Sequence, residues 1–124
     1  MMLLDTYAWV EFLRGTAKGN KVKNFLNETQ CFTCAISLAE LSLWAINENL
    51  DGKKILDAVK KLSVIINPDN ELLEAAGAIA YRKKLKFRNF GIIDAIILAA
   101  SKSYGLKVVT GDMHFADEEG TILL

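Results

Sequence analysis

The run Met2-Leu3-Leu4-Asp5-Thr6 places three consecutive apolar residues directly before a carboxylate. This apolar segment is too short and too uniform to be a strand with one face in water. It therefore predicts a strand in the middle of a sheet that is covered on both faces. Residues 6–13 carry apolar side chains at helical spacing, and Gly15 provides a stop signal. The sequence thus predicts a strand that passes into a helix at Asp5.

Strands and helices alternate along the rest of the chain. Apolar and β-branched runs predict further strands over residues 31–36, 62–66, 107–110 and 121–124. Helical spacing of apolar residues predicts further helices over residues 18–27, 37–47, 52–61, 70–85 and 92–104. Crossovers long enough to hold helices favour parallel strands with right-handed connections. We therefore predict one α/β domain over residues 1–124, a three-layer sandwich with a central parallel sheet.

Composition and charge exclude several classes of protein. The chain has 124 residues, of which 52% are hydrophobic, so it is not a disordered chain. Lys and Arg together number 15, as do Asp and Glu, so nucleic-acid binding through bulk charge is not expected. The longest apolar run, residues 92–100, is interrupted by Asp94 and is too short to span a membrane. The first residues lack a signal-peptide pattern, so we expect a cytoplasmic protein with no membrane partner.

Two cysteines, Cys31 and Cys34, form a CxxC pattern within a predicted strand. A structural zinc site needs four ligands, and the single histidine, His114, is far along the chain. A redox pair would open a helix, whereas residues three apart on a strand point to opposite faces. We therefore predict two small buried hydrophobic residues, and we assign His114 to a helix surface or to packing rather than to general-base catalysis.

Four carboxylates stand where predicted strands end or predicted helices begin: Asp5, Glu40, Asp94 and Asp112. In open parallel sheets ligands bind beyond the carboxyl ends of the strands, so these side chains are expected to converge there. Crowded carboxylates repel one another and are stabilised by a cation, and hard oxygen ligands favour Mg²⁺ or Mn²⁺. Because such an ion activates water and stabilises charge on phosphoryl oxygens, phosphodiester hydrolysis is the natural reaction.

Each acid also has a structural interpretation at a helix N-terminus. Asp5 and Asp112 could be N-caps, Ser37 and Glu40 fit a capping box, and Asp94 falls in a first helical turn. Against this interpretation, Asp94 interrupts a helix that is apolar on nearly every side. An unpaired buried carboxylate there would cost several kcal/mol, so a metal ion or a polar cleft explains it better.

Four short segments carry these acids in order: Leu3-Leu4-Asp5-Thr6, Ile36-Ser37-Leu38-Ala39-Glu40-Leu41, Gly91-Ile92-Ile93-Asp94-Ala95 and Val109-Thr110-Gly111-Asp112-Met113-His114-Phe115. Together they span essentially the whole chain, which resembles the PIN domain family and, within it, the short VapC-like toxin ribonucleases of toxin–antitoxin pairs. The resemblance implies a PIN fold and a metal-dependent endoribonuclease. It also implies a homodimer and a cognate antitoxin that blocks the acidic site.

The resemblance also implies roles for single residues. The implied metal ligands and catalytic acids are Asp5, Asp94, Glu40 and Asp112. Hydroxyl support would come from Thr110 or Ser37. In the implied mechanism, one of the carboxylates deprotonates a water held by Mg²⁺ or Mn²⁺, and this water attacks phosphorus in line. Tyr7 departs from the small hydroxyl residue that many relatives carry, and a tyrosine there would narrow the substrate mouth or hydrogen-bond the substrate.

One strongly basic stretch, residues 81–90, is interleaved with aromatic residues and leads towards Asp94; we call it the basic segment. Its cations suit RNA phosphates, and Tyr81, Phe87 or Phe90 would offer a stacking face. The alternative is a solvated helix end with both phenylalanines packed inward.

Large apolar residues on the early helices leave a second surface open to two interpretations: Trp9, Phe12, Leu41, Leu43 and Trp44. In the first interpretation, all of them are core residues. In the second, some of them contact another chain.

Two other functions compete with the nuclease. The first is a catalytically inactive PIN-fold domain that binds RNA or protein. The second is a phosphatase-like hydrolase with Asp5 as nucleophile, which would need a second acid at the position of Tyr7.

Overall fold

Five short parallel strands form the central sheet of the computed structural model, which describes residues 1–124. The strands are β1 (Met2–Leu4), β2 (Cys31–Cys34), β3 (Val64–Ile66), β4 (Lys107–Thr110) and β5 (Thr121–Leu123). They lie in the order β3-β2-β1-β4-β5, and every neighbouring pair is parallel. The first strand is therefore in the middle of the sheet, as its uniformly apolar sequence predicts.

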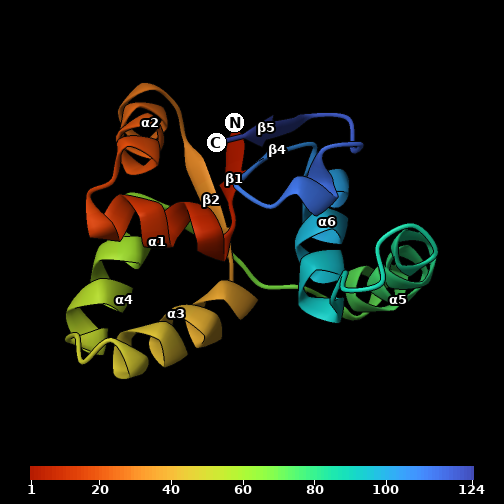
Figure 1. Cartoon of the computed structure of the whole chain (residues 1–124), viewed down its shortest axis with the longest axis horizontal. Coiled ribbons are helices and arrows are strands. Elements are labelled where there is room, and N and C mark those ends of the chain that lie inside the picture. The colour runs from red at the N-terminus through yellow and green to blue at the C-terminus, as the bar shows by residue number, and fades with distance from the viewer.

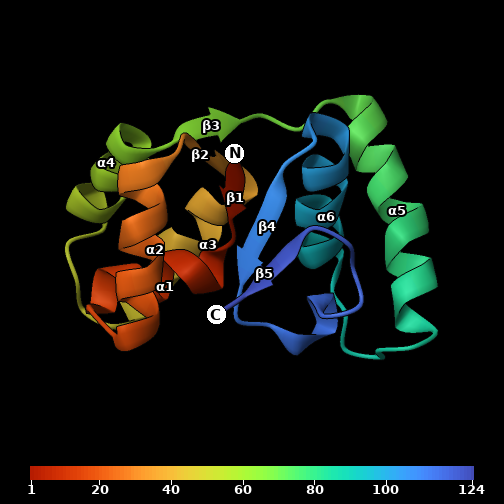
Figure 2. The same ribbon diagram turned by 90° about the horizontal axis from the view of Figure 1, so that it is seen from above.

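Six α-helices cover the two faces of this sheet (Figures 1 and 2). One face carries α1 (Thr6–Arg14), α2 (Ala17–Glu28), α3 (Ile36–Asn47) and α4 (Gly52–Leu62). The other carries α5 (Asn70–Lys84) and α6 (Ile92–Tyr104). A short 3-10 helix, η1 (Met113–Phe115), follows β4. The predicted α/β sandwich with a central parallel sheet is confirmed, and none of these helices combines the length and the apolar character that crossing a bilayer requires.

Alternating side chains of the strands build two separate hydrophobic cores. Leu3 and Cys34 pack with α5 and α6, whereas Leu4 and Cys31 pack with the four early helices. Both cysteines are free thiols and buried. The prediction that they are small core residues on opposite faces of a strand is confirmed.

Three predicted strands are longer than the strands that form, and β5 differs least because it ends one residue early, at Leu123. Ala35 has helical φ and ψ of −55° and −30°, so β2 ends at Cys34 and α3 begins at Ile36. The N–H of Ser63 donates to the carbonyl of Val59, so Leu62 belongs to α4 and not to the strand. Apolar runs at these boundaries do not distinguish a strand end from the adjoining helix turn, and backbone hydrogen bonding decides between them.

The connections leave the sheet in opposite directions on the two sides of β1. From β1 the chain moves to β2 and β3, then crosses over to place β4 and β5 on the other side. At such a switch point the connections diverge and leave a crevice beyond the carboxyl ends of the two central strands. Asp5 directly follows β1, and Asp112 follows β4 by two residues.

Candidate active site

A cleft of about 390 Å³ lies beyond the carboxyl ends of β1 and β4. Its lining consists of Asp5, Thr6, Tyr7, Glu40, Asp94, Ile97, Gly111, Asp112 and Met113. All four acids predicted from the sequence therefore lie in one cavity, although they come from four distant parts of the chain. Thr110 and Ser37, the predicted hydroxyl residues, do not line it.

Asp5 is the most deeply buried of the four acids, with 7% of its surface exposed. It is the N-cap of α1, and its Oδ1 accepts a hydrogen bond of 2.8 Å from the N–H of Ala8. Burial raises the pKa of Asp5 to about 7, and the charges of Asp94 and Asp112 act in the same direction. The hydrogen bonds from Thr110 and Ala8 only partly offset this rise. The carboxyl group can therefore hold or release a proton near neutral pH.

Asp94 lies in the first turn of α6, where its Oδ2 accepts a hydrogen bond of 3.4 Å from the N–H of Gly91. The predicted position in the first helical turn is thus confirmed, and the side chain also caps the helix. Burial also raises the pKa of Asp94, the charges of Asp112 and Glu40 add to the rise, and the bond from Gly91 opposes it. Asp94 therefore caps α6 and also places in the cleft a negative charge that its surroundings disfavour.

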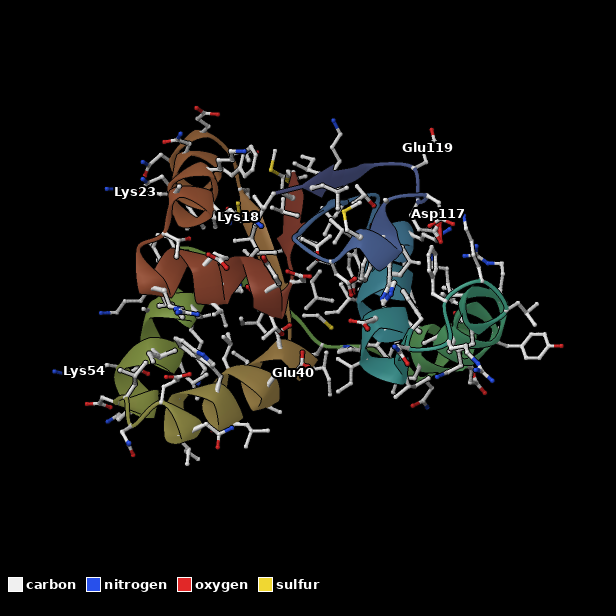
Figure 3. The ribbon with its side chains drawn as sticks, viewed as in Figure 1. Lys18, Lys23, Glu40, Lys54, Asp117 and Glu119 are labelled. Carbon is white, nitrogen blue, oxygen red and sulfur yellow. The ribbon has the colours of Figure 1, made fainter.

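Glu40 takes a different partner from the one its sequence suggests. The predicted capping box with Ser37 is wrong, because α3 begins one residue before Ser37 and Ala35 is its N-cap. The Ser37 Oγ is buried inside the helix without a hydrogen-bond partner. The Thr6 hydroxyl, 34 residues earlier in the chain, donates instead to Glu40 Oε1 over 2.5 Å. Figure 3 shows Glu40 at the end of α3 nearest to α6, between the two groups of helices.

Asp112 is the N-cap of η1 and accepts the N–H of His114 at Oδ1 over 2.9 Å. The imidazole Nδ1 of His114 lies 3.2 Å from the same oxygen. The ring of His114 packs against Phe87, with 5.0 Å between ring centroids. The predicted packing role of His114 is confirmed, but its contact with Asp112 had no signal in the sequence beyond their proximity.

In three of these carboxylates, one oxygen accepts a hydrogen bond from the protein and the other oxygen accepts none. The unbonded oxygens are Oε2 of Glu40, Oδ1 of Asp94 and Oδ2 of Asp112. No Lys or Arg forms an ion pair with any of the four acids. Their negative charge is therefore fixed in position by neutral donors and is not neutralised within the chain.

The donor set fits Mg²⁺ or Mn²⁺ in its chemistry, because hard divalent ions prefer carboxylate oxygens. No three potential ligands of the chain lie close enough together to hold an ion without other donors. Mg²⁺ is usually held by one or two carboxylates, with waters completing its octahedron. A cleft of about 390 Å³ has room for such waters, so the residues suit a hydrated ion better than a closed protein cage.

Tyr7, on the rim of the cleft, packs directly on the backbone of Gly111. A Cβ atom built on Gly111 would lie 2.0 Å from Cε1 of the tyrosine ring, so only glycine fits at this position. The hydroxyl of Tyr7 accepts a hydrogen bond of 3.1 Å from Nζ of Lys18 on α2. Sequence analysis singled out Tyr7 but missed Lys18, which stands eleven residues away in an unremarkable polar helix.

Three of the five cations of the basic segment form ion pairs within the fold, whereas Lys84 and Arg88 are exposed and form none. Nζ of Lys83 is buried and lies 2.6 Å from Asp117, and Lys86 is 3.2 Å from the same carboxylate. Arg82 pairs with Glu118 at 2.9 Å. The two phenylalanines of the segment pack inward. This inward packing agrees with the predicted solvated helix end, and contact of the exposed Tyr81, Lys84 and Arg88 with RNA stays a prediction.

Most of the large apolar residues on the early helices belong to the core. Trp9 and Leu41 are fully buried, and Phe12 and Trp44 pack against the same core. Leu43 is the exception, with 61% of its surface exposed. Only a small part of this set is therefore free to contact another chain.

Comparisons with known proteins agree with this fold. The family model of the PIN domain matches residues 2–119. Among solved structures, the chain is similar to a toxin–antitoxin complex from Klebsiella pneumoniae, with a TM-score of 0.81, 22% identity, and coverage of 98% of this chain and 96% of that chain. It is also similar to VapBC2 from Rickettsia felis, bound to a promoter DNA fragment, with a TM-score of 0.75, 19% identity and coverage of 99% and 96%.

A third similar structure is VapC20 from Mycobacterium tuberculosis, a toxin that cleaves the sarcin-ricin loop, with a TM-score of 0.73, 15% identity and coverage of 98% and 97%. No curated protein matches the sequence significantly. The family match spans nearly the whole chain, and the acids expected from the resemblance share one cleft. The chain belongs to the PIN domain family.

Proposed function

We propose that this chain, over residues 1–124, is a single PIN domain that acts as a Mg²⁺- or Mn²⁺-dependent endoribonuclease. One observation carries the proposal: four carboxylates from distant segments line a single cleft and have no Lys or Arg partner. Holding acids together is unfavourable, because the acids are partly buried and repel one another. Such an arrangement is typical of a site that binds a cation. The similarity in fold to a toxin that cleaves the sarcin-ricin loop supports RNA as the substrate.

The proposed metal ligands and catalytic acids are Asp5, Glu40, Asp94 and Asp112. A bound divalent ion would supply a more acidic water and a positive charge beside the phosphoryl oxygens. Hydrogen bonds from Thr6, Gly91 and the N–H of His114 orient three of the acids before any ligand binds. One of the four carboxylates would accept the proton that the attacking water loses.

We further propose that the protein is the toxin of a toxin–antitoxin pair and forms a homodimer. Two of the similar structures are toxin–antitoxin assemblies. In this chain, Leu43 and Ile46 of α3 expose 61% and 68% of their surfaces, which supports contact with an apolar partner. We assign its action to the cytoplasm because its proposed substrate is cellular RNA.

Cleavage of a labelled mixed RNA pool by the purified protein tests the enzyme. The reactions contain Mg²⁺ or Mn²⁺, with EDTA, Asp94→Asn and the exposed-acid control Asp57→Asn run in parallel. Cuts that require the metal and Asp94, and that survive Asp57→Asn, would support the nuclease. Absence of cleavage together with no metal-induced rise in melting temperature would contradict the metal site.

The second candidate function is a PIN-fold domain that binds RNA or protein without turnover. It is favoured by one observation, the lack of three potential ligands close enough to hold an ion alone. This candidate predicts that no RNA in the pool is cleaved, whether or not the metal raises the melting temperature. The same experiment therefore separates the two functions.

A further inference from the structure

Any RNA that enters the cleft meets a strongly negative surface. Four carboxylates repel the phosphates of the substrate, and the three pairing cations of the basic segment are already held by Asp117 and Glu118. Further attraction would come from cations that lie near the cleft and lack a carboxylate partner. Lys18 meets this description because it contacts the cleft residue Tyr7 and forms no ion pair.

Tyr7 has one supported face and remains partly open. Its ring lies against the backbone of Gly111, and the side chain lines the cleft beside Asp5. With 38% of its surface exposed, the residue still presents aromatic surface to solvent. An aromatic ring that packs on the protein with one face and is partly exposed to solvent is suited to stacking on an unpaired base.

Lys18 stands at the hydroxyl end of this ring rather than over its centre. Its Nζ is 3.1 Å from the hydroxyl oxygen but 5.5 Å from the ring centroid. The ammonium group therefore lies away from the centre of the ring. The hydrogen bond with Tyr7 raises the pKa of Lys18, so the side chain stays charged at all physiological pH values. Figure 3 shows Lys18 on the part of α2 that faces the middle of the molecule.

We propose that Tyr7 and Lys18 form a subsite for single-stranded RNA on the rim of the carboxylate cleft. Tyr7 stacks on an unpaired base next to the cleaved bond, and Lys18 binds a neighbouring phosphate. This inference rests on the proposed function and deepens it, because bases inside a duplex are already stacked on each other and cannot reach the ring. The pair thus selects RNA loops and unpaired ends over double-stranded RNA.

Binding of a fluorescein-labelled 12-nucleotide RNA of mixed sequence, followed by fluorescence anisotropy, tests the subsite. The buffer contains Ca²⁺, which also takes carboxylate ligands, and a gel checks that the RNA stays intact. The variants are Tyr7→Leu, which keeps apolar bulk against Gly111 without a ring, the ring-preserving Tyr7→Phe, and Lys18→Ala. The control is Lys23→Ala, since Lys23 lies on the outer side of α2 in Figure 3.

Loss of the stacking ring in Tyr7→Leu should raise Kd about tenfold, whereas Tyr7→Phe should change it by no more than about twofold. Loss of one phosphate contact in Lys18→Ala should lower the slope of log Kd against log salt concentration by about 0.7. Lys23→Ala should leave that slope unchanged. The same RNA annealed to its complement should bind wild type about tenfold more weakly than the single strand.

The subsite is refuted if Tyr7→Leu and Lys18→Ala bind the single strand as wild type does, or if the wild type binds the duplex equally well or binds no RNA. Melting temperatures of the variants confirm that each one folds. Cleavage of the same RNA in Mg²⁺ is scored separately. If binding depends on Tyr7 and Lys18 but the RNA is not cleaved, the nuclease is refuted and the subsite stands. If the RNA is cleaved but binding does not depend on these two residues, the subsite is refuted and the nuclease stands.

Discussion

Replacing Asp5 by Asn should make the metal-free protein more stable at neutral pH. The substitution removes a carboxylate that is 7% exposed and lies near two other acids. It keeps the N-cap of α1, because the Asn side-chain oxygen can accept the same bond from Ala8 N–H and Asn caps helices as well as Asp does. The variant therefore isolates the cost of the buried charge.

The magnitude follows from the pKa of Asp5, which burial raises from 3.8 to about 7. An acid with a higher pKa in the folded state binds its proton more tightly when folded. The free energy of unfolding therefore falls as pH rises from about 4 to about 7. At about 1.36 kcal/mol for each pH unit the full effect is about 4 kcal/mol. About 2.5 kcal/mol of it develops between about pH 5 and about pH 8.

Urea unfolding in EDTA, followed by circular dichroism at several pH values, measures this effect. Wild type should lose about 2.5 kcal/mol more than Asp5→Asn between about pH 5 and about pH 8. Asp94, whose pKa burial also raises, leaves a slope of the same sign in both proteins. Asp117, whose pKa is about 2, stays ionised throughout this range and does not contribute.

Divalent metal provides the matched control for the same variant. Mg²⁺ or Mn²⁺ should stabilise wild type at about pH 7.5 and should stabilise Asp5→Asn much less, because the variant lacks one of the proposed ligands. The reasoning fails if Asp5→Asn is less stable than wild type in EDTA at neutral pH. It also fails if the two proteins show the same pH dependence, since the burial of Asp5 would then carry no electrostatic cost.

Three further variants test other parts of the structure. Asp94→Asn should abolish metal-dependent RNA cleavage while its melting temperature in EDTA stays at or above that of wild type; loss of folding would instead support a purely structural acid. Gly111→Ala should cost about 1–3 kcal/mol in urea unfolding, because the new Cβ would lie 2.0 Å from the ring of Tyr7, and a Tyr7→Ala background should remove most of that cost. Lys83→Met should cost about 1–3 kcal/mol at neutral pH, because Asp117 loses its 2.6 Å partner. It should also weaken the acid-induced loss of stability between about pH 4 and about pH 2, where Asp117 is protonated; an unchanged acid profile would contradict this account.

Much of the fold could be predicted because local sequence patterns mark its strands and helix ends. The uniformly apolar run at Met2–Leu4 marks the central strand, and Gly91 and Gly105 mark the two ends of α6. The four acids could be found for a similar reason, since Asp5 and Asp112 follow strands, and Glu40 and Asp94 lie in the first two turns of helices. In a parallel sheet those positions meet at one edge, whatever the details of packing.

The sequence by itself thus determined the layers, the central strand and the acids that share the cleft, because periodicity and chain reversals are properties of neighbouring residues. Only the tertiary structure decided which partners the polar side chains take. Glu40 bonds to Thr6 rather than to its own helix, and Lys83 is neutralised by Asp117; each pair is separated by 34 residues. No local pattern encodes such pairings, since they depend on how the helices and loops pack around the sheet. The same packing sets the burial of Asp5, and with it the proton affinity of the site.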